Sequence, residues 1–319
     1  MQGCPATAHH HRVHLRPIRP SPILTRLAFG VLWLLHFLPL RALAAVGSFA
    51  GTIGYYLARS RRRIGRVNLA LCFPHLSSRD REQLLKRHFR AFGRSVFERG
   101  IIFWGPKARI QATVCLEGIE NFEALKGTPL IIFAPHFVGI DMAAARLATE
   151  YRACGMYARQ SNSIADEMLR RGRNRFGNAV LFPRDEGLLP VLQAMKEGLP
   201  FLYAPDMDLG APHSIFVPFF GVTAATTTGL SVIARVTRAK VLPLIAVQRP
   251  AGYVARMLPA WDDFPSADAD ADTRRMNAYI EARILEMPEQ YHWLHKRFKT
   301  QPPGKPDPYA QGAPAGPEA

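Results

Sequence analysis

The chain has 319 residues, a formal net charge of +16 and an isoelectric point near 10.2. Hydrophobic residues make up 48 % of it, which excludes an intrinsically disordered chain, and its length suits one large α/β domain or two small ones. The excess of positive charge indicates an anionic partner, which could be nucleic acid, an anionic membrane surface, or an acidic carrier protein or substrate.

The N-terminal residues 1–22 predict a disordered, basic and histidine-rich tail. Prolines and arginines surround its histidines, and a histidine cluster of this kind could also bind a metal ion. These histidines are His9, His10, His11 and His14.

Residues 23–58 are the most apolar part of the chain and predict a membrane-associated helical segment. Two uncharged runs, 27–40 and 42–58, flank Arg41, and neither alone reaches the roughly 20 residues that span a bilayer. Three arrangements stay open: one displaced span, a re-entrant hairpin, or two helices in the interface. A buried helix of a soluble protein is the alternative. Tyrosines and a run of arginines at the end of the segment favour contact with anionic headgroups on the cytoplasmic face.

From residue 59 to residue 301 the pattern predicts an α/β domain, and residues 302–319, rich in proline, glycine and alanine, predict a disordered tail. The domain begins with an amphipathic, strongly basic helix over 77–104. Apolar strands then alternate with helices, which predicts a mixed, mainly parallel sheet flanked by helices. Strands are predicted at 113–119, 129–135, 154–159, 179–184, 200–206 and 240–247, an edge strand at 255–260, and helices at 141–152, 188–198, 227–238 and 270–287.

The cysteines of the chain show neither metal-ligand nor redox spacing, so we predict no metal site. Scattered thiols in a chain of this length suit a reducing compartment, which favours the cytoplasmic side. Buried, unreactive thiols are the simplest interpretation. The cysteines are Cys4, Cys72, Cys115 and Cys154.

The most informative stretch joins a strand to a helix across a short turn that carries His136 and Asp141. Active sites of open α/β sheets gather at the carboxyl ends of the strands, where we expect His136. Asp141, five residues later, can return across the turn toward the imidazole. A carboxylate on one ring nitrogen fixes the tautomer and leaves the other nitrogen free to take a proton. The pair therefore suits general-base attack of a hydroxyl on an activated thioester.

Simpler interpretations stay open on the spacing alone. A loop carbonyl could hold His136, and Asp141 could serve only as a helix N-cap. The apolar stretch 215–222 could line an acyl channel or pack in the core. Residues 226–229 could bind an anion at a helix start or only cap that helix, and the basic residues 295–299 could bind phosphate or face solvent.

HFVGID (136–141) resembles the HxxxxD/E signature that glycerolipid acyltransferases share with lipid A biosynthesis acyltransferases. Other stretches, in the same order along the chain, resemble the lipid A biosynthesis acyltransferase family in particular, and the resemblance covers roughly residues 25–303. These stretches are RRRIGRVNLALCFP (61–74), GRNRFGNAVLFPRDEG (172–187), YAPDMDLGAPHSIFVPFFGVTAATTTG (203–229) and QYHWLHKRFKTQPPG (290–304).

The resemblance implies a glycerolipid-acyltransferase-like fold and a role for individual residues. It implies that His136 and Asp141 are the catalytic pair, although many members carry glutamate where Asp141 stands. It also implies substrate-binding roles for Arg173, Arg184 and Asp206. The two arginines would hold a phosphate or the developing oxyanion. The aspartate would orient an arginine or a sugar hydroxyl, or only cap a turn.

The resemblance further implies transfer of a fatty acyl chain from acyl carrier protein to a hydroxyl of a lipid A precursor of the Kdo-lipid IVA type. It implies no cofactor beside this acyl-acyl carrier protein co-substrate, and a place at the bacterial inner membrane with the catalytic domain on the cytoplasmic side. An enzyme of the same fold that acylates a glycerolipid or another membrane lipid is the alternative. A non-enzymatic basic protein that binds membranes or nucleic acid is disfavoured, because aromatic residues are not interleaved with the basic runs.

Overall fold

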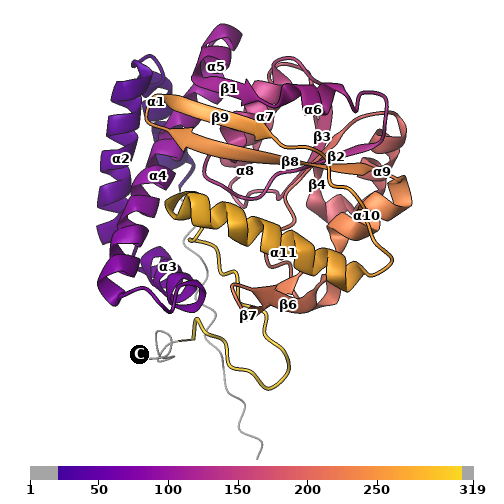
Figure 1. Cartoon of the computed structure of the whole chain (residues 1–319). Coiled ribbons are helices and arrows are strands. Elements are labelled where there is room, and N and C mark those ends of the chain that lie inside the picture. Colours follow the sequence, from indigo (N-terminus) through magenta and orange to yellow (C-terminus); the bar gives the residue numbers. More distant parts are fainter. Residues whose placement is uncertain (1–20, 311–319) are drawn as a thin grey trace, which may run out of the picture.

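The computed structural model describes residues 21–310, whose centre is a seven-stranded sheet with helices on both faces (Figure 1). The strand order is β1-β9-β8-β2-β5-β3-β4, and of the paired strands only β8 and β9 run antiparallel in this sheet. The predicted α/β fold with a mainly parallel sheet is therefore confirmed. The strands are β1 (Val114–Glu117), β2 (Leu130–Phe133), β3 (Ala153–Tyr157), β4 (Ala179–Pro183), β5 (Phe201–Tyr203), β8 (Lys240–Arg249) and β9 (Gly252–Met257).

Helices cover both faces of the sheet, and a separate two-stranded hairpin of β6 (Ile215–Phe219) and β7 (Val222–Thr226) lies below α11 in Figure 1. The helices are α1 (Pro22–Leu35), α2 (Leu40–Leu57), α3 (Arg59–Cys72), α4 (Ser78–Trp104), α5 (Lys107–Thr113), α6 (Ile119–Glu123), α7 (Ile140–Ala148), α8 (Ser163–Arg173), α9 (Leu189–Lys196), α10 (Gly229–Thr237) and α11 (Ala269–Glu286), with short 3-10 turns at Arg184–Glu186, Ala211–His213 and Pro288–Gln290.

Alternate residues of the central strands enter two different cores, because successive side chains of a strand point to opposite faces. Ile131 and Phe133 of β2 pack on the face that α11 covers, whereas Leu130 and Ile132 pack with α7 on the other face. Each of these side chains is at most 2 % exposed. Burial on both faces explains why the strand sequence LIIF is continuously apolar.

One of the predicted assignments on the sheet is wrong, and one open alternative is decided. The strand expected at the edge is β9, which lies inside the sheet because β1 pairs alongside it. For the apolar stretch 215–222, which forms the hairpin of β6 and β7, core packing is the interpretation that holds, and the stretch does not line the cavity. Phe219 shows why, since its side chain is fully buried in the core against the rings of Tyr291 and Phe298.

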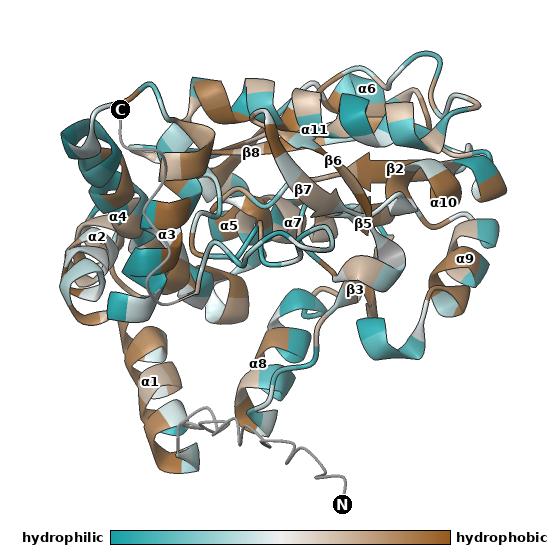
Figure 2. Cartoon of the chain, turned by 90° about the horizontal axis from the view of Figure 1, so that it is seen from below, coloured by the Kyte–Doolittle hydropathy of each residue, from teal (hydrophilic) through white to brown (hydrophobic). Residues whose placement is uncertain are grey.

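The N-terminal apolar segment forms two helices, α1 and α2, which meet near Pro39. α2 packs closely on α4, because a Cβ atom at Gly51 would lie 2.2 Å from the carbonyl oxygen of Phe89. α1 extends beyond the sheet beside α8 (Figure 2), to which Asn162 Nδ2 ties it by a 2.7 Å hydrogen bond to Thr25 Oγ1. Within residues 21–310 no helix has the length and apolarity needed to cross a membrane.

The C-terminal prediction needs a correction in its first part. Residues 302–310 are described by the structure and hold Tyr309, whose side chain is 6 % exposed. Its hydroxyl bonds Asn68 of α3 and accepts the backbone N–H of Phe298 at 3.1 Å, which anchors a segment expected to be disordered. The predicted tail 1–22 falls, apart from its last two residues, outside the described residues, as does 311–319.

Candidate active site

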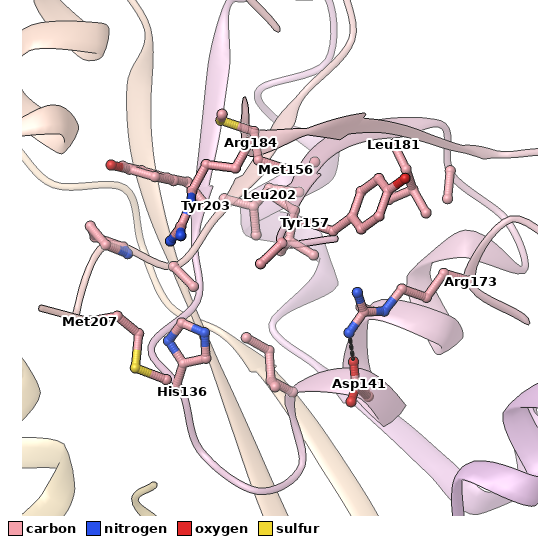
Figure 3. Close-up of a pocket in the computed structure, with 18 of the residues that line it drawn as sticks. His136, Asp141, Met156, Tyr157, Arg173, Leu181, Arg184, Leu202, Tyr203 and Met207 are labelled. Carbon is pink, nitrogen blue, oxygen red and sulfur yellow. Dashed lines mark hydrogen bonds and ion pairs between the residues drawn. The ribbon is translucent and has the colours of Figure 1, made fainter. Parts of the chain in front are cut away.

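A cavity of about 880 Å³ opens at the carboxyl ends of the parallel strands and continues between the sheet and α7. This volume lies within the range of roughly 300–1,000 Å³ that ligand pockets occupy. Figure 3 shows that the side chains predicted for the site meet there: His136, Asp141, Arg173 and Arg184 all line the cavity. Residues that are far apart in sequence are therefore gathered around one cavity, and of these the strand–turn–helix pattern had predicted the place of His136.

His136 and Asp206 follow two neighbouring strands, each three residues after the strand ends. β2 and β5 are paired in register, Phe133 with Tyr203, so the two side chains arrive side by side. Asp206 Oδ1 lies 2.6 Å from His136 Nδ1, and Asp206 Oδ2 accepts the backbone N–H of His136 at 3.0 Å. Because the carboxylate can only accept, Nδ1 carries the proton and Nε2 is the basic nitrogen.

The surroundings of this pair favour a charged aspartate and a basic imidazole. Burial alone would lower the pKa of His136, but the charge and hydrogen bond of Asp206 raise it above its ordinary value of 6.5. Burial raises the pKa of Asp206, yet His136 brings it down to about 2. The imidazole remains 29 % exposed while the carboxylate is 1 % exposed. The ring can therefore meet a substrate, and Asp206 can act on that substrate only through the ring.

Two other histidines line the cavity and differ from His136 in their proton affinity. Burial lowers the pKa of His292 to about 3 and that of His295 to about 4. His295 already uses Nε2 to accept the backbone N–H of Asp208 at 3.2 Å. Among the described histidines of the cavity, His136 alone has a raised pKa, which suits a general base near neutral pH.

The C-terminal segment holds the loop that carries His136. The carbonyl of His136 accepts the N–H of His292 at 3.1 Å, and the N–H of Val138 donates to Gln290 at 2.8 Å. Asn68 of α3 in turn donates to the carbonyls of Trp293 and His295, both at 2.7 Å. Two of the stretches that resemble the family, 61–74 and 290–304, thus support the position of the catalytic loop.

Asp141 occupies a different environment, between two arginines. Its Oδ2 accepts Nε of Arg99 at 2.8 Å, and its Oδ1 accepts from Arg173 at 2.9 Å (Figure 3). Burial raises the pKa of Asp141, but the two guanidinium groups hold it well below its usual range. Asp141 also lies in the first turn of α7, where the helix dipole favours a negative charge. The carboxylate therefore stays ionised, and one positive charge remains in excess around it.

Two of the predicted contacts are corrected by this geometry. We expected Asp141 to hold the imidazole, but Asp206 does so, since the adjacent strand brings it beside His136 whereas α4 and α8 bring arginines to Asp141. We expected Asp206 to bind substrate, but a side chain that is 1 % exposed and turned onto His136 offers a substrate no oxygen. Asp141 lines the cavity, and its catalytic role remains a prediction.

The two predicted arginines lie at different places around the cavity. Arg173 ends α8 beside Asp141, and its side chain is 36 % exposed. Arg184 follows β4 and is exposed, and it forms no ion pair with any residue between 21 and 310. An unpaired guanidinium at a cavity mouth can bind an anionic group. Both positions at the cavity agree with the predicted substrate-binding role.

Arg99 is the site residue that sequence reasoning missed. It lies in α4, within the predicted basic helix, and its guanidinium contacts Asp141 with two nitrogens, Nε and an Nη, each at 2.8 Å. The only signal was its place among the basic residues of that helix. Selecting it would have required the knowledge that α4 passes beside the start of α7.

Known proteins similar to this chain are acyltransferases that build lipid A. The chain is 33 % identical over 297 residues to the lipid A biosynthesis lauroyltransferase of Escherichia coli (strain K12), covering 92 % of this chain and 96 % of that protein. It is 31 % identical over 293 residues to the palmitoleoyltransferase of the same bacterium, covering 90 % and 95 %. The myristoyltransferase is 33 % identical over 273 residues, covering 84 % and 83 %. The chain is therefore an acyltransferase of the lipid A type.

A sequence model of bacterial lipid A biosynthesis acyltransferases matches residues 15–300. The chain belongs to the bacterial lipid A biosynthesis acyltransferase family. A solved structure, the 1-acyl-sn-glycerophosphate (LPA) acyltransferase PlsC from Thermotoga maritima, is 16 % identical with a TM-score of 0.35, over 75 % of this chain and 98 % of that one. So distant a likeness supports no inference about the site.

Proposed function

We propose that this enzyme transfers a fatty acyl chain from acyl carrier protein to a hydroxyl of a lipid A precursor of the Kdo-lipid IVA type, with His136 as the general base. The observation that carries the proposal is the 2.6 Å contact between Asp206 and His136 Nδ1, which leaves Nε2 basic beside the cavity. The raised pKa of His136 and the family of the chain support it.

In this reaction Nε2 of His136 removes the proton of the acceptor hydroxyl as its oxygen attacks the thioester carbonyl carbon. The tetrahedral intermediate then collapses with cleavage of the carbon–sulfur bond. The leaving thiolate takes the proton from the imidazolium, so the products are an ester and a free thiol. Asp206 stabilises the imidazolium and keeps the ring in the reactive tautomer.

The arginines beside Asp141 supply positive charge where negative charge develops or is bound. Arg99 and Arg173 together carry two charges against the single charge of Asp141, and both line the cavity. We propose that Arg173 stabilises the oxyanion or binds a phosphate of the lipid. The unpaired Arg184 binds a phosphate of the lipid or of the carrier's prosthetic arm. Asp141 acts by holding the two arginines in place.

The proposal is tested with purified enzyme, lauroyl-acyl carrier protein and labelled Kdo-lipid IVA. His136→Ala is expected to lower kcat by about 10²–10⁴-fold, the share that general-base catalysis supplies. His75→Ala, at an exposed histidine away from this cavity, is the matched control and keeps the wild-type rate. A His136→Ala enzyme as fast as the control would remove the catalytic assignment. Faster transfer to a lysophosphatidic acid than to Kdo-lipid IVA would favour the glycerolipid alternative.

We also propose that α1 and α2 attach the enzyme to an anionic membrane surface on the cytoplasmic side of the inner membrane. α1 leaves Leu24, Leu27 and Leu34 each at least 60 % exposed, at helical spacing, and α2 leaves Phe49 68 % exposed. Arginines flank these side chains, and a basic, apolar helical surface suits anionic headgroups. α8, which carries Arg173, lies beside α1, so this attachment sets the site close to a lipid acceptor.

Sedimentation with phosphatidylglycerol vesicles tests the attachment. The double substitution Leu24→Glu and Leu27→Glu is expected to release most of the enzyme from the vesicles, because it places two charges on the buried side of the contact. Leu285→Glu, at a leucine of α11 that is 61 % exposed, is the control and leaves vesicle binding unchanged. Equal release by both variants would show that the α1 surface is not the site of contact.

A further inference from the structure

The cavity does not end at the catalytic edge of the sheet. Its charged lining residues, such as Arg173 and Arg184, gather where the parallel strands end. Beyond them it continues between β3 and α7, where the lining side chains are mainly apolar and small. These side chains include Ala144, Ala145, Ala148, Ala153, Gly155 and Leu169.

One residue of β3 that lines this apolar part has no side chain. Gly155 lies in the middle of β3 and pairs with Leu181 of β4 on one side and with Leu202 of β5 on the other. Residues paired in register point to the same face of a sheet. Both leucines line the cavity, so the missing side chain at Gly155 leaves a groove between them.

A Cβ atom fits at position 155 without strain, so this is not a close contact that only glycine tolerates. A Cβ atom built on Gly155 would meet its nearest neighbours at 3.7 and 3.8 Å, which is ordinary van der Waals contact. The backbone of Gly155 has no positive φ. By contrast, Cβ atoms at Gly51 or Gly93 would collide with backbone atoms at 2.2 and 2.5 Å. Folding therefore does not require glycine at position 155, which points to a role in what the cavity holds.

We propose that the groove over Gly155 receives the distal part of the acyl chain and that the size of residue 155 sets the longest chain the enzyme transfers. This inference rests on the proposed function. Gly155 lies two residues before Tyr157 at the carboxyl end of β3, about 7 Å further in at ~3.3 Å per residue. With its carbonyl carbon beside His136, a chain that enters the groove places its later methylenes, and not its reacting end, over Gly155.

Two substitutions move the limit in opposite directions. Gly155→Val fills the groove with a side chain that strands accept well, and is expected to shift the ratio of kcat/KM for decanoyl over myristoyl donors by at least about tenfold toward decanoyl. Leu181→Ala widens the groove from the side and is expected to raise the use of palmitoyl donors relative to lauroyl donors. The readout is product mass after reaction with each acyl-acyl carrier protein.

The control lies one residue from Leu181 on the opposite face. Val180 packs against the α11 core and does not line the cavity, so Val180→Leu adds volume beside β3 without entering the groove. Its donor preference is expected to match that of the wild type. A donor ratio is independent of the folded fraction, so partial unfolding of a variant cannot imitate the shift.

The outcomes separate this inference from the function on which it rests. A wild-type enzyme that transfers no acyl chain to any acceptor overturns the proposed function. A wild-type enzyme that transfers chains, with Gly155→Val and Leu181→Ala both keeping its donor profile, overturns the role of the groove alone. Opposite shifts in the two variants, with Val180→Leu unchanged, are the result that we expect.

Discussion

Two carboxylates at this site, the buried Asp206 behind His136 and the partly buried Asp141, have surroundings that differ in kind. Asp206 faces one imidazole and a backbone N–H, whereas Asp141 faces two guanidinium groups. Both carboxylates have pKa values below the ordinary value of aspartate, through His136 in one case and through the two arginines in the other. Aspartate therefore serves a different task at each of the two positions. The neighbouring side chains determine that task, and the spacing of the sequence motif does not.

Proton transfer therefore belongs to the side of the cavity with His136 and Asp206. The side with Asp141 and its two arginines supplies fixed charge. An imidazole exchanges its proton near neutral pH, so the carboxylate that holds it affects the protonation of the base. A guanidinium does not lose its proton in a protein, so the carboxylate that holds it affects only position and electric field. Substitution of each aspartate by asparagine should thus produce different kinetic signatures.

The largest effect is expected from Asp206→Asn. The amide keeps the size of the side chain, but it no longer stabilises the imidazolium and can turn its N–H toward Nδ1, which favours the unreactive tautomer. We expect kcat to fall by about 10³-fold. Asp185→Asn, at an exposed carboxylate paired with Arg159, is the control and should keep its rate. An Asp206→Asn enzyme within threefold of the control would show that the carboxylate is not needed for proton transfer.

A smaller loss, of about 10–100-fold, is expected for Asp141→Asn. Without the carboxylate Arg99 and Arg173 repel one another, so the oxyanion and phosphate contacts lose their geometry. Glu167→Gln, in the exposed pairs of α8, is the control, because surface ion pairs contribute little. Steady-state kinetics with separate kcat and KM values measures the effect. A loss as large as that of Asp206→Asn would place both carboxylates on the proton-transfer path.

The sequence could predict those parts of the site whose contacts join residues close together in the chain, and not those whose contacts join distant segments. His136 was found because strand, turn and helix are local features, and a polar residue at that point lies at the carboxyl edge of a parallel sheet. The partner of His136 was not found, because it requires that β5 pair beside β2, an order that no local pattern records. HxxxxD spacing favoured Asp141, which is near in sequence but faces α4 and α8.

The same distinction holds for the fold. Alternation of apolar strands and helices predicted the mainly parallel sheet, yet the position of β9 inside it depends on pairing with β1, more than a hundred residues earlier. The ordered segment around Tyr309 was expected to be disordered because its composition is rich in proline and glycine. Its order comes from one buried ring and its hydroxyl contacts with α3, which composition does not register.

The pH dependence gives a third test, with an effect of about tenfold for each pH unit. His136 must be neutral to act as a base, so kcat/KM should fall as pH drops through its raised pKa, above 6.5. In Asp206→Asn burial still lowers that pKa while the opposing charge is gone, so the midpoint moves to lower pH. Asp141→Asn should move the midpoint less, because Asp141 raises the pKa of His136 less than Asp206 does. Equal shifts in both variants would contradict separate roles.

The smallest effect is expected from Arg99→Lys, which keeps the charge beside Asp141 but loses the contact through two nitrogens. Lysine presents a single ammonium group that cannot hold the carboxylate in a fixed plane. Arg173 should then be less well oriented, and we expect kcat to fall about three- to tenfold with the pH midpoint unchanged. Arg90→Lys, at an exposed arginine of the same helix, is the matched control. If Arg99→Lys instead shifted the pH midpoint as Asp206→Asn does, the arginine pair would act on the imidazole, and the two sides of the cavity would form a single proton-transfer unit.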